Sequence, residues 1–136
     1  GMENAWVMAP KPQLIRVFVN LITNAIQAVE IRQRELEAEG EEMIQGNVVI
    51  YLRNSTKDGY YDVVVDDNGS GVKEENISRL FTPNFTTKSA GTGLGLAICR
   101  NIMEKCGGEI SYKRSFALGG ASFTVTIPKK EDDEKC

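Results

Sequence analysis

The chain has 136 residues, which suits one domain, and its 41% hydrophobic and 26% charged residues are the mixture of a folded globular protein. The formal net charge of −3 argues against a general nucleic-acid binder, because such a protein needs a basic face to neutralise phosphates. No apolar run reaches the length expected of a membrane span and no signal-peptide pattern opens the chain, so we expect a cytoplasmic domain without direct membrane contact.

Histidine is absent from all 136 residues. This absence excludes catalytic triads and zinc sites that are built on histidine. Of the three cysteines, Cys99 and Cys106 are seven residues apart in a helical pattern, which separates them by about 10 Å along the axis and is too far for a disulfide. Unpaired, widely spaced thiols fit a reducing cytosol.

A long helix is predicted to begin around Pro12, because proline is tolerated in a first helical turn. Apolar residues then recur at helical spacing and define one buried stripe. Its members are Leu14, Val17, Phe18, Leu21, Ala25, Ala28 and Val29. A charged segment, residues 30–45, follows, and its second half is interpreted as a solvated helix end or loop.

Two hairpins are predicted downstream. Residues 47–53 alternate as a strand, Lys57-Asp58-Gly59 is a turn signal, and residues 60–67 form the returning strand. Residues 72–81 are expected to hold a short helix with Glu74 and Glu75 in its first turn. A second helix is expected over residues 96–106, after a loop over 82–95, and it should end in a left-handed cap at Gly107-Gly108. Residues 109–116 and 121–128 form the second hairpin, and the polar tail 129–136 is expected to fray.

This order of elements predicts an α+β fold with two layers. Because the strands come in hairpin pairs, the sheet should be mixed or mostly antiparallel, with the helices on one face. We expect one domain over residues 1–136, with its core at about 9–128.

Asp67 ends the second predicted strand on the same face as Tyr61, Val63 and Val65, which is the more apolar face and should lie under the helices. An unpaired carboxylate there would be costly, so a partner with hydrogen-bond donors is expected. Gly69 and Gly71 would let a ligand or another part of the chain approach closely. The alternative is a turn in which Asp67 serves only the backbone.

Two further patterns suggest phosphate chemistry. Asn20, Asn24 and Gln27 form a polar line on the long helix, and amide oxygens can complete an Mg²⁺ shell shared with phosphates; the alternative is a solvated helix face. The segment 91–96 is a glycine-rich loop that leads into a helix N-terminus, where bare N–H groups favour phosphate; the alternative is a flexible linker. Leu96 stands where a dinucleotide-binding fingerprint needs its third glycine.

Together these segments resemble the GHKL ATPase superfamily, and in particular the catalytic ATP-binding domain of two-component sensor histidine kinases of the nitrogen-regulatory kind. Residues 20–28 resemble the N box, 67–71 the G1 box, 80–88 the F box, 91–96 the G2 box and 120–128 the closing strand. The resemblance covers about residues 9–128 and implies a Bergerat-type ATP-binding sandwich. The chain departs from the family pattern at Ala9, where relatives often carry Asp, and at Asn84, where an aromatic residue is common.

The resemblance implies ATP and Mg²⁺ as cofactors and a role for each matching residue. Asn24 would coordinate Mg²⁺, supported by Asn20 and Gln27, and Asp67 would accept the adenine amino group, with Gly69 and Gly71 against the base. The remaining implied ligands hold or reach phosphates, and Asn24 and Lys88 are the implied catalytic residues. These phosphate ligands are Thr87, Lys88, Thr92, Gly93, Leu94 and Gly95. Phe81 and Phe85 would pack near the lid, or serve as ordinary core aromatics.

The same resemblance separates two kinds of chemistry. Superfamily members that hydrolyse ATP place a glutamate four residues before the metal-binding asparagine as general base, whereas this chain has Asn20 there, which cannot take a proton at neutral pH. The resemblance therefore implies that the chain donates the γ-phosphoryl group to a histidine on an upstream dimerisation domain. It also implies a response regulator as the partner of the full-length kinase, and this parent protein can be anchored to a membrane. A non-catalytic nucleotide-binding module and a hydrolytic ATPase are the alternatives. The isolated domain is expected to be a monomer.

Overall fold

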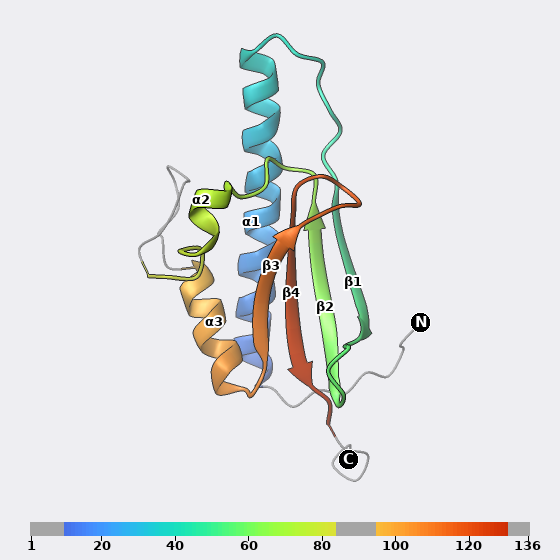
Figure 1. Ribbon diagram of the computed structural model, residues 1–136, viewed down its shortest axis with the longest axis vertical. Coiled ribbons are helices and arrows are strands. Elements are labelled where there is room, and N and C mark those ends of the chain that lie inside the picture. The colour runs from blue at the N-terminus through green and yellow to red at the C-terminus, as the bar shows by residue number, and fades with distance from the viewer. Residues whose placement is uncertain (1–9, 84–94, 131–136) are drawn as a thin grey trace.

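The computed structural model describes residues 10–83 and 95–130. Its elements in chain order are α1 (Lys11–Ala38), β1 (Val48–Asn54), β2 (Tyr60–Asp67), α2 (Glu74–Ile77), α3 (Gly95–Lys105), β3 (Glu109–Arg114) and β4 (Ala121–Pro128). The strands form one sheet in the order β1-β2-β4-β3, and the helices lie on one face of it (Figure 1). The predicted two-layer α+β architecture is confirmed.

All strand pairs of the described sheet are antiparallel, so of the two predicted possibilities, a mixed or a mostly antiparallel sheet, the described residues show the antiparallel one. Hairpin turns at residues 55–59 and 115–120 connect β1 to β2 and β3 to β4. The two central strands, β2 and β4, begin 61 residues apart in sequence, at Tyr60 and Ala121. Their antiparallel pairing aligns Val65 with Phe123 and Asp66 with Ser122. This non-local pairing brings the end of β2 beside the start of β4.

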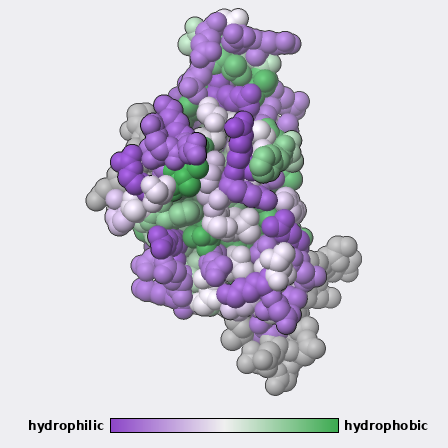
Figure 2. Space-filling view, in the orientation of Figure 1, coloured by the Kyte–Doolittle hydropathy of each residue, from purple (hydrophilic) through white to green (hydrophobic). Residues whose placement is uncertain are grey.

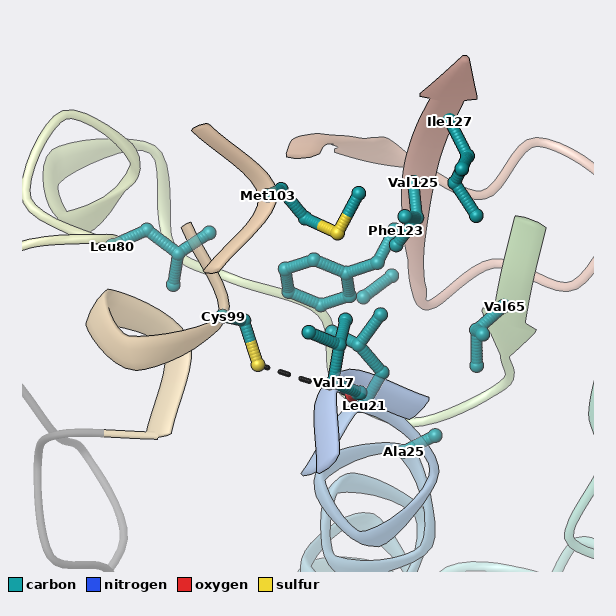
Figure 3. Close-up of a cluster of buried hydrophobic side chains, with 11 residues drawn as sticks. Val17, Leu21, Ala25, Val65, Leu80, Cys99, Met103, Phe123, Val125 and Ile127 are labelled. Carbon is teal, nitrogen blue, oxygen red and sulfur yellow. Dashed lines mark hydrogen bonds between the residues drawn. The ribbon is translucent and has the colours of Figure 1, made fainter. Parts of the chain in front are cut away.

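Helix α1 packs its predicted stripe on the sheet. Pro12 lies in its first turn, and Val17, Leu21, Ala25 and Val29 are buried. Figure 3 shows the first three of these residues meeting Val65 and Phe123 from the sheet and Cys99 and Met103 from α3. The helix extends only to Ala38, and an extended segment leads from there to β1.

A second apolar face of α1 carries Ile15, Val19 and Ile26, each about half exposed. Because α1 is apolar on two faces, an 18-residue window reaches a mean hydropathy of 1.4, and by length and composition alone the helix could cross a membrane. The sequence analysis expected no such segment. One such helix near the N-terminus is weak evidence for a membrane span, because the core helix of a globular protein passes the same test. Most residues of the buried stripe of α1 form part of the hydrophobic core.

Helix α2 is the short helix expected within residues 72–81, and Glu74 and Glu75 lie in its first turn as predicted. Its four residues are followed by tight turns in which Arg79, Leu80 and Thr82 each donate a backbone hydrogen bond to the carbonyl three residues earlier. Such i to i+3 bonds wind the chain more tightly than an α-helix. The turns bring Leu80 into the core and place Phe81 edge-on against Phe123, with ring centroids 6.2 Å apart, which favours the core-aromatic interpretation of Phe81.

Helix α3 ends as the sequence predicts. Gly107 has φ +79°, and the Gly108 N–H reaches back to the Met103 carbonyl at 2.8 Å, which is the arrangement of a left-handed helix cap. The face of the molecule seen in Figure 2 is mostly hydrophilic, with small apolar areas near α2 and the middle of the sheet rather than one large patch.

Candidate functional site

Asp67 lies at the end of β2 on the helix-facing side of the sheet and is only 1% exposed, as the strand alternation predicts. Its Oδ1 atom accepts hydrogen bonds from the backbone N–H groups of Gly69 at 2.8 Å and Ala121 at 3.2 Å. The turn that the sequence analysis held as the alternative is therefore present.

Glycine is required at the two positions of the turn, Gly69 and Gly71, for different structural reasons. A Cβ on Gly69 would lie 2.7 Å from the backbone carbonyl carbon of Ala28, so here the close approach is made by α1. Gly71 has φ +75°, a left-handed conformation that favours glycine. The turn is thus wedged between α1 and the start of β4.

Asn20 joins the amide line of α1 to α3. Asn20, Asn24 and Gln27 are half-buried, and the Asn20 side-chain amide donates to the Cys99 sulfur at 3.6 Å. The structure thus places the Asn20 amide against α3, while Asp67 lies at the end of β2, on which α1 packs. Among the described residues no group of three or more acidic, cysteine or histidine side chains could hold a metal ion.

Gly95 is the first residue of α3, and among the described residues no atom lies within 4 Å of a Cβ built on it. The other predicted phosphate ligands, Thr87, Lys88, Thr92, Gly93 and Leu94, lie outside the described residues, as does Phe85.

Gly120 is a residue of the site that was not predicted as such; from the sequence it was interpreted only as part of a hairpin and of the closing strand. A Cβ there would overlap Asp67 Oδ1 and lie 2.7 Å from the Gly69 nitrogen, and the Gly120 N–H donates to the Asp67 carbonyl at 3.1 Å. The β2–β4 register creates this contact, so no local signal could have revealed it.

Gly120→Ala is expected to lower the free energy of unfolding by about 1–3 kcal/mol, because the added methyl must displace Asp67 or the backbone of the turn. The matched control is Gly119→Ala. Gly119 has φ +88° and open space around its Cβ position, so this variant costs only about 1–2 kcal/mol of backbone strain. Urea unfolding measures both losses. Only Gly120→Ala should also weaken ADP binding, and equal ADP affinities in the two variants would show that Gly120 does not shape the Asp67 site.

Cys99 is buried between α1 and α3, and burial raises the pKa of its thiol; the Asn20 hydrogen bond and the Arg16 charge act in the opposite direction with smaller effect. We expect Cys99 to be less ionised than an ordinary cysteine at pH 8–9, where such a thiol is partly thiolate, and to react with a thiol reagent much more slowly than the partly exposed Cys106. Single-cysteine variants labelled in native buffer and in urea test this. Equal native labelling rates would contradict it.

The comparisons with known proteins agree with this geometry. Residues 10–131 match the model of the family described as Histidine kinase-, DNA gyrase B-, and HSP90-like ATPase. Because that match covers most of the chain, the chain belongs to this family of ATPases.

Two relatives from this comparison are sensor kinases. The chain is 38% identical over 122 residues to sensor histidine kinase ZraS of Salmonella typhimurium, a match that covers 90% of this chain and 23% of ZraS. It is 36% identical over 127 residues to the sensor protein FixL of Bradyrhizobium diazoefficiens, covering 93% of this chain and 23% of FixL. The chain thus spans about a quarter of the length of these relatives.

Solved structures give the same result. The catalytic domain of histidine kinase ThkA, in a nucleotide-free form, matches with a TM-score of 0.69 and 33% identity, over 89% of this chain and 69% of that one. The chain is accordingly a catalytic domain of the histidine-kinase type.

Proposed function

We propose that this chain binds Mg·ATP and donates the γ-phosphoryl group to a histidine on a separate dimerisation domain of its parent sensor kinase. The observation that carries the proposal is the buried Asp67 carboxylate at the end of β2, on the same face of the sheet as α1 with its line of amides. In this arrangement Asp67 would accept the adenine amino group, and Asn24 would supply an amide oxygen to Mg²⁺. The metal would neutralise charge on the triphosphate.

The chain's own contribution is to hold the nucleotide in line with its acceptor. As the bond from the γ-phosphorus to the acceptor nitrogen forms, the bond to the β,γ-bridging oxygen breaks and ADP leaves. Positioning and charge neutralisation supply most of the rate enhancement in such transfers. The chain contains no histidine, so the acceptor nitrogen belongs to another domain, and a response regulator would receive the phosphoryl group next. A cytoplasmic location would suit these partners, whether or not a membrane anchors the parent.

Asn20 favours transfer over hydrolysis. It stands where hydrolytic relatives carry a general base, and its amide is engaged with Cys99 of α3. An amide cannot activate water by taking its proton. We therefore expect slow phosphate release by the chain alone.

The direct test supplies the purified chain with γ-labelled ATP and the parent's separate histidine-bearing domain. We expect label on that domain with Mg²⁺ present and no label when its histidine is replaced by glutamine. ATP binding without any transfer would favour a non-catalytic nucleotide-binding module. Steady phosphate release by the chain alone would favour a hydrolytic ATPase.

A further inference from the structure

Arg32, on the second half of α1, holds the turn that follows β2. Its Nη1 atom donates a hydrogen bond to the Asn68 carbonyl oxygen at 2.7 Å, and Asn68 stands between Asp67 and Gly69. We propose that Arg32 is a positioning residue that sets the orientation of Asp67 for reading an adenine base. This inference rests on the proposed nucleotide site and adds a residue to it that the sequence patterns did not indicate.

The contact belongs to a continuous line on α1. Asn20, Asn24, Ala28 and Arg32 follow one another at four-residue intervals, so each lies beside the one before it on the helix surface, along a stripe that turns slowly around α1. Asn20 contacts α3, Ala28 lies close to Gly69, and Arg32 contacts the carbonyl of the preceding residue, Asn68. The stripe of α1 that includes the proposed metal ligand therefore continues to the turn that would bind the base.

A third contact completes this attachment. The Ser70 hydroxyl donates to Glu35 Oε1 at 2.9 Å, but both groups are exposed, so this bond contributes little. The Arg32 bond is different, because a charged donor meets the carbonyl of a buried residue, and such bonds are among the stronger hydrogen bonds in proteins. Arg32 is thus the main polar link between α1 and the turn.

The opposite side of the turn is held independently. The Asn68 side chain accepts from the Asn47 N–H and donates to the Gln45 carbonyl, both at 2.8 Å, and the Asn68 N–H donates to the Asn47 carbonyl. These bonds attach the turn to the segment before β1 and do not involve Arg32. Without Arg32 the turn stays folded but can tilt away from α1, which changes where Asp67 points relative to Asn24.

The test compares ADP with inosine diphosphate, which carries a carbonyl where adenine has its amine. Arg32→Met should weaken ADP binding about tenfold and lower the ratio of ADP to inosine diphosphate affinity, with the urea midpoint lowered but the cooperative unfolding transition kept. Arg32→Lys, which keeps a donor, should recover part of the loss. Because Arg32 acts through Asp67, adding Arg32→Met to Asp67→Asn should cost less than the sum of the single changes.

Arg34→Met is the matched control, since Arg34 is an exposed arginine two residues away on the same helix. A wild-type chain that binds both nucleotides equally removes base reading by Asp67, and so counts against the proposed site whatever Arg32 does. A wild-type chain that prefers ADP, with an Arg32→Met variant indistinguishable from Arg34→Met, overturns the role of Arg32 alone. If Arg32→Met fails to fold, Arg32→Gln takes its place, with the same loss expected and an unchanged ratio decisive against the proposal.

Discussion

Asp67→Asn is expected to weaken ADP binding by about 1.5–3 kcal/mol, roughly 10- to 150-fold, while the domain stays folded. The amide oxygen of asparagine can still accept the N–H groups of Gly69 and Ala121 that Asp67 Oδ1 accepts. The amide nitrogen, however, is a donor and cannot accept the adenine amine. Calorimetric titration with ADP, together with urea unfolding, measures the two effects separately.

Asp66→Asn is the matched control for this change. Asp66 is the preceding residue of β2, is also buried, and lies on the opposite face of the sheet, paired with Ser122. It should leave the ADP affinity unchanged, because its side chain points away from the helices. An Asp67→Asn variant that binds ADP as tightly as the wild type would remove Asp67 from the binding site.

Asn24→Ala is expected to reduce phosphoryl transfer by about a hundredfold or more, because a metal that stabilises transition-state charge is worth several kcal/mol. The affinity for ATP should no longer increase when Mg²⁺ is added, whereas metal-free ADP should still bind through Asp67. The fold should tolerate the change, since alanine is the better helix former in α1. Titrations with and without Mg²⁺, and transfer to the histidine-bearing domain, measure both effects.

Thr23→Ala is the control for Asn24, because Thr23 is the exposed neighbour on the same helix. It should leave both the transfer rate and the Mg²⁺ dependence unchanged. If the Mg²⁺ dependence survives Asn24→Ala, the metal ligand of the protein lies elsewhere.

Local sequence signals predicted most of the elements. The bounds of β2 and β4 agree with the alternation of apolar residues, and the Gly107-Gly108 pair marks the end of α3. The short helix expected within residues 72–81 is confirmed at Glu74–Ile77, and i to i+3 bonds continue the chain beyond it. Helical periodicity cannot distinguish these two kinds of turn, since both place residues three apart on one side.

Part of the site could be predicted in the same way. The inward direction of Asp67 follows from its place in an alternating strand, and the structure confirms it. The binding roles of Asp67, Asn20, Asn24 and Gln27 remain predictions, as do those of the residues outside the described ranges. Gly120 and Arg32 carried no local signal, because each matters only through a contact with a residue more than 30 positions away.

The sequence by itself determined which residues turn inward and which chemical groups the chain offers: a carboxylate at the end of an apolar strand, amides along a helix, and no histidine to accept phosphate. These properties depend on the side-chain period of each element and on composition, which are local. Only the tertiary structure decided how the carboxylate is held, with Ala121 and Gly120 against it from β4 and Arg32 and Ala28 against its turn from α1. The pairing of β2 with β4 and the packing of α1 create those contacts, and both join segments that are remote in sequence.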